Sequence, residues 1–324
     1  MIIGGAEDKL RKRTILQEFV RAAGGLDARI AVIPTASSIG TEVTEVYDAL
    51  FRREGAVDVV AVRPESRDDA HDPRLVEAIE GATGVFMTGG NQLKLSSIVC
   101  GTPLGNAVVA ANRRGVVVGG TSAGASIQSS HMLAFGGPGA TPKQRMTQMA
   151  AGLGLIGSAV IDQHFDQRNR YGRLLMIVAQ SPQLLGIGVD EDTCAVITQE
   201  DGPQGRHELL NVLGRGSVTI MDPARIVSIA HEAKRSSPLL ASGVVLHVLP
   251  AGATFDLTTR TLVPAPTRVD PEDAAELAEA QRDMLQLARD IAAADASPSA
   301  LRRRLARTRT KIRPKPDHLE GPVS

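Results

Sequence analysis

The stretch that decides the fold reads Val116-Val117-Val118-Gly119-Gly120-Thr121-Ser122-Ala123-Gly124. An apolar strand leads directly into a G-x-S-x-G turn, and a helix-forming run, residues 125–130, follows the turn. This order predicts a nucleophile elbow, in which small neighbours allow a strained turn to expose the serine hydroxyl at the carboxyl edge of a sheet. The start of the helix would place positive partial charge beside an oxyanion. Because a serine at a helix start is often only an N-cap, the motif alone leaves both interpretations open.

Outward from this turn, short apolar strands alternate with amphipathic helices. The predicted strands are residues 1–3, 30–33, 57–62, 85–88 and 116–118. The predicted helices between them include residues 15–23, 42–51 and 75–79. This alternation predicts right-handed βαβ units, and therefore an α/β fold with a mostly parallel sheet sandwiched by helices.

The pattern changes after about residue 186. Predicted strands at 187–189, 194–198, 209–212, 218–221 and 244–249 follow one another closely, so we expect additional, partly antiparallel strands within the same domain. We therefore expect a catalytic domain over residues 1–266 and a charged, helical extension over residues 267–324. The basic run in this extension suits either a solvated helical face against an acidic neighbour or a docking arm for an anionic partner.

Composition narrows the class of protein. Of 324 residues, 43% are hydrophobic and 22% charged, as in a globular protein with a large core. Lys plus Arg and Asp plus Glu number 36 each, so no overall charge favours nucleic acid or a membrane surface. Cys100 and Cys194 offer no metal spacing or disulfide framework. With neither a signal-peptide pattern nor a membrane-length apolar run, we expect a cytoplasmic protein without a metal.

A nucleophilic serine needs a base, and histidine suits that role near neutral pH. Among the seven histidines, His164 follows the apolar run Val160-Ile161-Asp162-Gln163 at the start of a polar loop, where α/β folds assemble their sites. His131, which comes soon after the elbow, remains an alternative by spacing. The third group should be a carboxylate that fixes the imidazole tautomer. Asp190, Glu191 and Asp192 follow another predicted strand, and strand alternation separates Glu191 from the other two without choosing between the faces.

Several motifs together resemble a known family. They are Ile3-Gly4-Gly5-Ala6-Glu7-Asp8-Lys9, Thr88-Gly89-Gly90-Asn91-Gln92, the elbow, Asp162-Gln163-His164-Phe165, and Gly186-Ile187-Gly188-Val189-Asp190-Glu191-Asp192-Thr193. In this order they are similar to the cyanophycinases, serine peptidases of family S51, from residue 2 to about residue 260. The resemblance implies a class I glutamine amidotransferase-like, flavodoxin-like α/β fold with serine in place of cysteine.

The resemblance also implies roles for individual residues. Ser122 would attack, His164 would act as base and then acid, and Glu191 would orient His164. The oxyanion hole would use the backbone N–H groups of Gly90 and Ala123. The chain order Ser, His, acid differs from that of the α/β-hydrolases and argues against a lipase or esterase.

The substrate implied is cyanophycin, multi-arginyl poly-aspartate, cleaved to β-Asp-Arg dipeptides by a homodimer that needs no cofactor. The family's substrate cleft is matched by a set of polar residues: Gln92, Asp162, Gln163, Arg168, Arg170 and Arg173. Arginines suit planar carboxylates, although a structural salt-bridge cluster is the alternative for the crowded arginines. Rival functions are an aspartyl dipeptidase of the same superfamily and a binding protein without catalysis. His131, the loop 136–145 and the extension have no counterpart that we can assign.

Overall fold

The computed structural model describes residues 1–202 and 205–264, together with Arg282, Met284 and Gln286. Residues 1–265 form one compact unit. The predicted boundary at residue 266 and the helical nature of the extension remain predictions, because nearly all of the extension lies outside the described residues.

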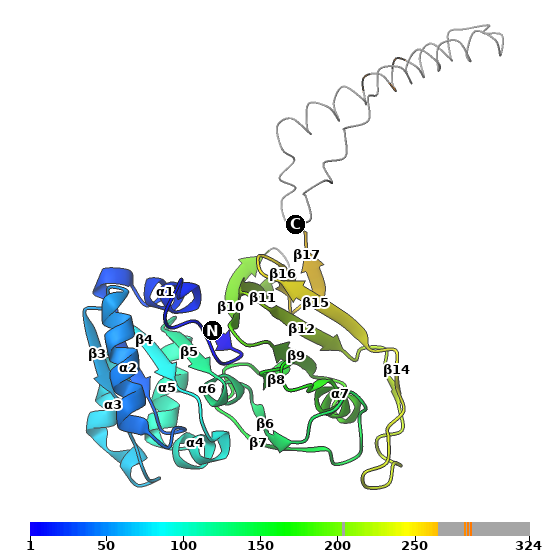
Figure 1. Ribbon diagram of the computed structural model, residues 1–324, viewed down its shortest axis with the longest axis horizontal. Helices are drawn as coiled ribbons and strands as arrows, with labels where there is room; N and C mark the ends of the chain where they lie inside the picture. The colour runs from blue at the N-terminus through cyan, green and yellow to red at the C-terminus, as the bar shows by residue number, and fades with distance from the viewer. Residues whose placement is uncertain (203–204, 265–281, 283, 285, 287–324) are drawn as a thin grey trace, which may run out of the picture. The chain divides into compact units, whose positions relative to one another are not determined.

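A nine-stranded sheet runs through this unit in the order β17-β16-β11-β10-β1-β5-β4-β2-β3 (Figure 1). Its parallel part is β1 (Ile2–Ile3), β5 (Val117–Thr121), β4 (Gly84–Met87), β2 (Arg29–Ile33) and β3 (Asp58–Ala61). Its antiparallel part is β10 (Thr193–Gly202), β11 (Gly205–Gly214), β16 (Thr254–Asp256) and β17 (Thr261–Val263). The predicted α/β fold with extra C-terminal strands is therefore confirmed, and the large sheet is mixed, with the predicted parallel strands on one side of β1 and antiparallel strands on the other.

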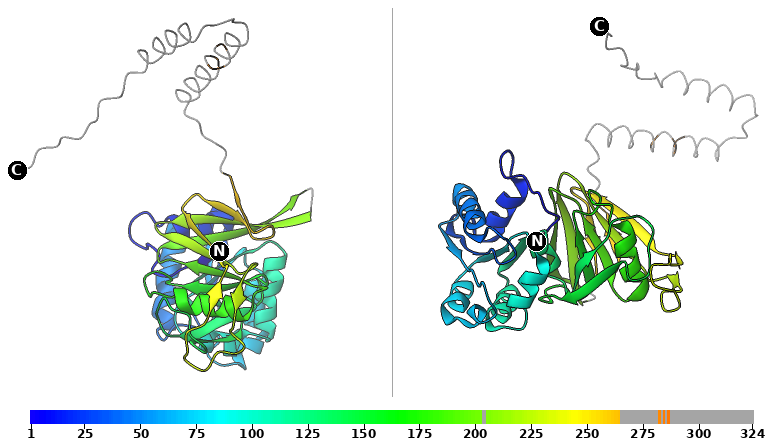
Figure 2. Two further views of the ribbon diagram at one scale, coloured as in Figure 1. Left: turned by 90° about the vertical axis from the view of Figure 1, so that its right-hand side faces the viewer. Right: turned by 60° about the horizontal axis from the view of Figure 1, so that its bottom comes forward.

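Helices cover both faces of the parallel part (Figure 2). On one face α1 (Thr14–Ala22) and α2 (Gly40–Arg53) pack Phe19, Tyr47 and Phe51 against Phe86 of β4. On the other face α3 (Pro73–Glu80), α4 (Gln92–Val99) and α5 (Pro103–Arg113) pack aliphatic side chains against alternate residues of the same strands. Short 3-10 turns stand at η1 (Gly25–Asp27) and η2 (Asp69–His71). Alternating burial along each strand thus builds a two-sided core.

A second, four-stranded sheet has the order β15-β12-β9-β8. It comprises β8 (Ala159–Gln163), β9 (Leu185–Val189), β12 (Ser217–Asp222) and β15 (Val245–Pro250), and α7 (Tyr171–Gln180) connects the parallel pair β8 and β9. Apolar side chains of both sheets meet in one cluster, which includes Ile2, Ala195, Ile187 and Ile220. Two hairpins complete the unit: β6 (His131–Gly136) with β7 (Thr147–Ala151), and β13 (Val227–Ser228) with β14 (Ala241–Ser242).

The helix after the elbow is shorter than predicted. The α6 helix covers Ala123–Ser126 only, rather than the run to residue 130. The chain leaves the helix because Gln128 O accepts from Leu155 N and Ser130 N donates to Ile156 O. Long-range pairing therefore overrides the local helix preference.

Within the described residues, no single helix is both long and apolar enough to cross a bilayer. The pair α4 and α5 passes that test only jointly, by length and composition, across a 95° bend.

Candidate active site

The predicted site residues gather where strands of the two sheets end. Ser122 directly follows β5 of the large sheet, while His164 and Glu191 follow β8 and β9 of the small sheet. The two sheets are joined here by a main-chain bond of 2.8 Å from His164 N to Gly4 O, just beyond β1. The carboxyl ends of parallel strands are where α/β folds place their sites.

Three side chains form one hydrogen-bonded row at this position. Ser122 Oγ lies 3.0 Å from His164 Nε2, and His164 Nδ1 lies 2.6 Å from Glu191 Oε1. Ser122 is half-buried, His164 is buried and the Glu191 side chain is 36% exposed. A hydroxyl, an imidazole and a carboxylate in this order can activate the hydroxyl as a nucleophile.

The structure also separates the acids that the sequence left open. The Asp190 carboxylate accepts from Ser217 N and Ser217 Oγ at 3.0 and 2.8 Å. The Asp192 carboxylate accepts from Asp8 N at 2.8 Å. Both aspartates therefore hold loops together, and Glu191 is the member of the trio whose side chain meets the imidazole.

The backbone is strained at two of the three positions. Ser122 has φ 52° and ψ −107°, and His164 has φ 47°. Non-glycine residues in this region are held there only where the surroundings fix them, which is common at functional sites. The glycines of the elbow have a steric role, since a Cβ on Gly120 would lie 2.1 Å from Gly124 O. The small residues expected for a nucleophile elbow are thus required by close approach.

Two backbone N–H groups lie near the serine. A Cβ built on Gly89 would lie 3.3 Å from Ser122 Cβ, so the loop after β4 abuts the nucleophile. Gly90 N and Ala123 N donate no hydrogen bond to another part of the chain that the structure describes. Such groups are what an oxyanion hole requires.

The environment of His164 keeps the imidazole neutral. Burial lowers the pKa of His164; Glu191 counteracts that change, while the cations of Arg168 and Arg170 add to it. The pKa therefore lies below the ordinary value of 6.5. A neutral imidazole can accept a proton from Ser122 at neutral pH.

Three residues predicted to line the cleft form a buried ion-pair cluster. Arg173 Nε donates to Asp162 Oδ2 at 2.6 Å, and Arg170 Nη1 donates to Asp162 Oδ1 at 3.2 Å. The side chain of Asp162 is fully buried, and those of Arg173 and Arg170 are 3% and 10% exposed. Burial lowers the pKa of Arg170 to about 10 in spite of Asp162. These contacts favour the alternative of a structural salt-bridge cluster, and a direct substrate contact by the three residues stays a prediction.

The other three predicted cleft residues occupy different positions. Gln163 is buried, with Oε1 3.3 Å from Ser122 Oγ. Arg168 is exposed and close enough for its charge to affect His164. Gln92 is half-buried and donates from Nε2 to the carbonyls of residues 133 and 134, at 2.9 and 2.7 Å. Arg168 thus presents a cation to solvent beside the row.

The loop 136–145 is attached to the segment that follows His164. Arg173 Nη1 donates to Gly136 O at 3.0 Å, Gly139 N donates to Asn169 O, and Gly172 N donates to Gly139 O. His131 lies exposed on β6 and takes no part in the row. The structure therefore favours His164 over His131 as the partner of Ser122.

One carboxylate near the row has no role assigned by sequence reasoning. Glu7 is 3% exposed, and its Oε2 accepts from Thr121 Oγ1 at 2.6 Å. Its place in the motif Gly4-Gly5-Ala6-Glu7-Asp8 was the available signal, but the chain position alone suggested only a helix cap.

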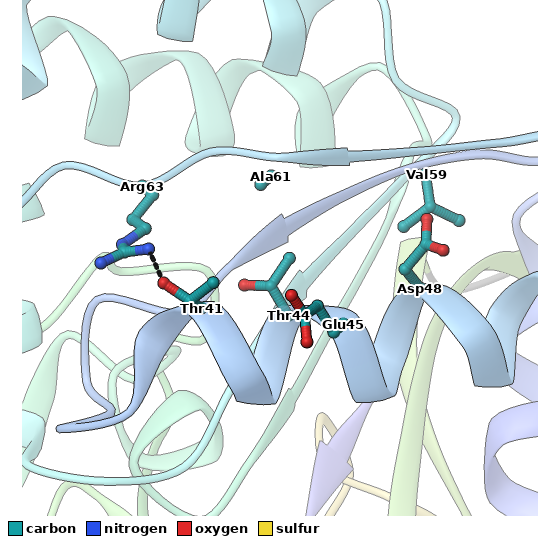
Figure 3. A pocket seen from close by; sticks show the side chains of 7 residues that line it. All are labelled: Thr41, Thr44, Glu45, Asp48, Val59, Ala61 and Arg63. Atoms are coloured by element: carbon teal, nitrogen blue, oxygen red, sulfur yellow. Dashed lines mark hydrogen bonds between the residues drawn. The ribbon is translucent and has the colours of Figure 1, made fainter.

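A groove lies away from the row, between α2 and β3 (Figure 3). Two of its charged groups are already paired: Asp48 with Arg52 at 2.9 Å, and Arg63 with Glu65 at 2.7 Å and with Thr41. It contains none of the predicted site residues. In the part of the chain that the structure describes, no cluster of three or more His, Cys, Asp or Glu side chains could hold a metal ion.

Known proteins resemble the chain in sequence and in fold. A sequence model described as Peptidase family S51 matches residues 1–204. A cyanophycinase of Nostoc sp. strain PCC 7120 is 41% identical over 271 residues, 83% of this chain and 89% of that protein. A cyanophycinase of Geminocystis herdmanii is 40% identical over 261 residues, 80% of this chain and 93% of that protein. The crystal structure of a peptidase from an acI-B1 actinobacterium shares the fold, with a TM-score of 0.52 and 19% identity, and covers 76% of this chain and 95% of that one.

Proposed function

Because the chain belongs to peptidase family S51, we propose that Ser122 is its catalytic nucleophile, His164 its general base and acid, and Glu191 the group that orients His164. The chain is a serine peptidase. The observation that carries the assignment of residues is the hydrogen-bonded row of Ser122, His164 and Glu191, at 3.0 and 2.6 Å.

The row supports a two-step acyl transfer. Ser122 Oγ attacks the carbonyl carbon of the scissile bond while His164 Nε2 takes its proton. Glu191 accepts the hydrogen on His164 Nδ1 and stabilises the imidazolium. Gly90 N–H and Ala123 N–H bind the oxyanion, and His164 then protonates the leaving amine. Water, activated by the same imidazole, hydrolyses the ester on Ser122.

The substrate is cyanophycin. Relatives named cyanophycinase are 40 to 41% identical over at least four fifths of the chain, which supports the same polymer as substrate and β-Asp-Arg dipeptides as products. Each repeat of the polymer carries a guanidinium and a free carboxylate, and the exposed Arg168 beside the row offers a partner for such a carboxylate.

Turnover of cyanophycin by the purified protein tests this proposal. We expect β-Asp-Arg in the supernatant of a cyanophycin suspension and no product from Ser122→Ala, whose melting temperature should match the wild type because only an accessible hydroxyl is lost. Faster turnover of aspartyl dipeptides than of polymer would instead identify an aspartyl dipeptidase. A wild-type protein that neither turns over a substrate nor reacts with a serine-directed phosphonate at Ser122 would contradict catalysis.

A homodimer located in the cytoplasm completes the proposal. The resemblance of the sequence to cyanophycinases is the support for the dimer. Light scattering coupled to size-exclusion chromatography tests the dimer, and a monomer at micromolar concentration would contradict it.

A further inference from the structure

We propose that Glu7 is a positioning residue for the reaction and that it holds the nucleophile elbow through the hydroxyl of Thr121. This inference rests on the proposed role of Ser122 as nucleophile. Glu7 contacts neither the serine nor the imidazole in any hydrogen bond of the described structure, so its effect on the reaction passes through its neighbours.

Both oxygens of the Glu7 carboxylate are engaged. Oε2 accepts from Thr121 Oγ1 at 2.6 Å, and Oε1 accepts from Lys9 Nζ at 2.7 Å and from the Tyr47 hydroxyl. Burial raises the pKa of Glu7, but the Lys9 charge and the three hydrogen bonds outweigh it, so the pKa lies below its ordinary value. Glu7 is thus a buried, ionised group whose two oxygens accept from three donors.

The hydrogen bond between Thr121 and Glu7 holds the residue immediately before the nucleophile. Thr121 is the last residue of β5, and Ser122 follows it with a positive φ of 52°. A strained turn keeps its geometry only where the residues around it are fixed. The hydrogen bond from Ser122 N to Ile3 O, 3.0 Å long, fixes the turn from one side. The bond from the Thr121 hydroxyl to Glu7 fixes the residue that leads into the turn.

The segment that contains Glu7 also contacts His164 and the residue next to Glu191. We name residues 4–8 the N-terminal loop. Its Gly4 O accepts from His164 N at 2.8 Å, and a Cβ on Gly5 would lie 2.3 Å from His164 Cε1. Its Gly5 O accepts from Asp192 N at 2.9 Å, next to Glu191.

The N-terminal loop therefore contacts the nucleophile, base and acid segments at once. Because Glu7 anchors this loop to β5, loss of its charge should disturb the alignment of Ser122 with His164. Such a misalignment reduces the rate of the chemical step more than it weakens substrate binding.

Glu7→Gln is the first test, since it keeps the size of the side chain and removes the charge. We expect kcat on cyanophycin to fall about 10- to 100-fold, with KM changed by less than about twofold. The rate constant for labelling of Ser122 by a serine-directed phosphonate should fall in parallel. Labelling does not depend on the natural substrate, so it separates failure of this proposal from failure of the cyanophycin assignment.

Thr121 supplies a second test that leaves Glu7 in place. Thr121→Val removes the hydroxyl without changing the shape and should reproduce the loss of kcat, whereas Thr121→Ser should retain most of the activity. The double variant Glu7→Gln with Thr121→Val should be no slower than the worse single variant, because both changes weaken the same contact between Thr121 and residue 7.

A partly buried ion pair, formed by Arg13 and Glu54, provides the control. Arg13 and Glu54 pair with side chains 11% and 9% exposed, and their contact involves no part of the row. Glu54→Gln should lower the melting temperature and leave kcat and the labelling rate unchanged. If folded Glu7→Gln or Thr121→Val keeps wild-type kcat and labelling rate, Glu7 serves stability alone and the proposal is overturned. Failure of the wild type itself to label overturns Ser122 as nucleophile, and this inference with it.

Discussion

At the scale of single residues, the protonation state of His164 decides whether Ser122 can be activated. The imidazole must be neutral to take the proton, and its pKa is held below 6.5 by burial and by nearby cations. Peptidase activity should therefore persist into mildly acidic solution, where an ordinary histidine would already be protonated. The acidic limb of the profile of kcat/KM against pH reports this pKa in the free enzyme.

Arg168→Ala should move that acidic limb to higher pH. The Arg168 cation lowers the pKa of His164, so its removal lets this pKa rise. At a given pH below 7, a smaller fraction of the imidazole is then uncharged. The limb is measured with a short, soluble fragment of cyanophycin between pH 4 and pH 8, a range that brackets the pKa of an ordinary histidine. Arg74 is exposed and paired with Asp72 on α3, so Arg74→Ala is the control and should leave the limb in place. A limb that does not move in Arg168→Ala contradicts the proposed electrostatic coupling.

Glu191→Gln should lower kcat by about 10⁴-fold, as the corresponding change does in the Ser-His-Asp template. The amide keeps the shape of the side chain but favours the wrong imidazole tautomer, so His164 Nε2 no longer accepts the serine proton. The Glu191 side chain is 36% exposed, and we expect the melting temperature to change little. Steady-state kinetics and a thermal melt measure the two effects. Near wild-type kcat in this variant would show that another group orients His164.

At the scale of elements, the ion pairs of Asp162 fasten α7 to the end of β8. Asp162 lies in β8, while Arg173 belongs to α7 and Arg170 directly precedes it. Gln163 and His164 follow Asp162 in the chain, so this cluster fixes the backbone from which the base projects. The burial of these three side chains suits a structural role, whereas residues that line a cleft need not be buried.

Asp162→Asn should lower the free energy of unfolding by about 3–5 kcal/mol, because it leaves two buried guanidinium groups without a countercharge. Denaturant titration measures the loss. Asp222 pairs with Arg260, whose side chain is 28% exposed, so Asp222→Asn should cost less and serves as the control. KM for cyanophycin distinguishes the two roles, since a raised KM with unchanged stability would support direct substrate binding by Asp162.

Strand alternation and glycine positions predicted the parallel sheet, but pairing across the chain could not be read from them. The runs that became β8 and β9 resemble the strands of the large sheet, yet they form a second sheet together with β12 and β15. That choice depends on contacts between segments far apart in the sequence, such as Ile220 beside Ile187. The α6 helix was predicted too long for the same reason.

The candidate site was predictable where the residue type limited the chemistry. Ser122 and His164 stood at strand ends in contexts that suit a nucleophile and a base, and the structure brings their side chains together. A charged residue type does not show whether the side chain will face solvent or pair with another buried side chain. Arg173 was therefore predicted as a cleft residue, and the structure buries it against Asp162. Glu7 was overlooked because its partner, Thr121, is remote in sequence.

At the scale of the whole molecule, the row depends on how two sheets are held together. The large sheet supplies Ser122, and the small sheet supplies His164 and Glu191. The shared apolar cluster, with Ile2 on one side and Ile187 on the other, sets the distance between the sheets. The distances between Ser122, His164 and Glu191 therefore depend on how this cluster packs.

A chain shortened to residues 1–266 should fold and retain kcat, because the four apolar clusters and the complete row lie within residues 1–264. Its melting temperature and its kcat on a short, soluble fragment of cyanophycin should equal those of the full chain. Comparison on insoluble cyanophycin then tests the basic run of residues 302–315 as a docking arm. A raised KM for the insoluble polymer, with KM for the short fragment unchanged, would support that function, because a cationic segment attracts the free carboxylates of the polymer. Loss of folding in the shortened chain would show instead that the extension belongs to the catalytic domain, contrary to the boundary expected at residue 266.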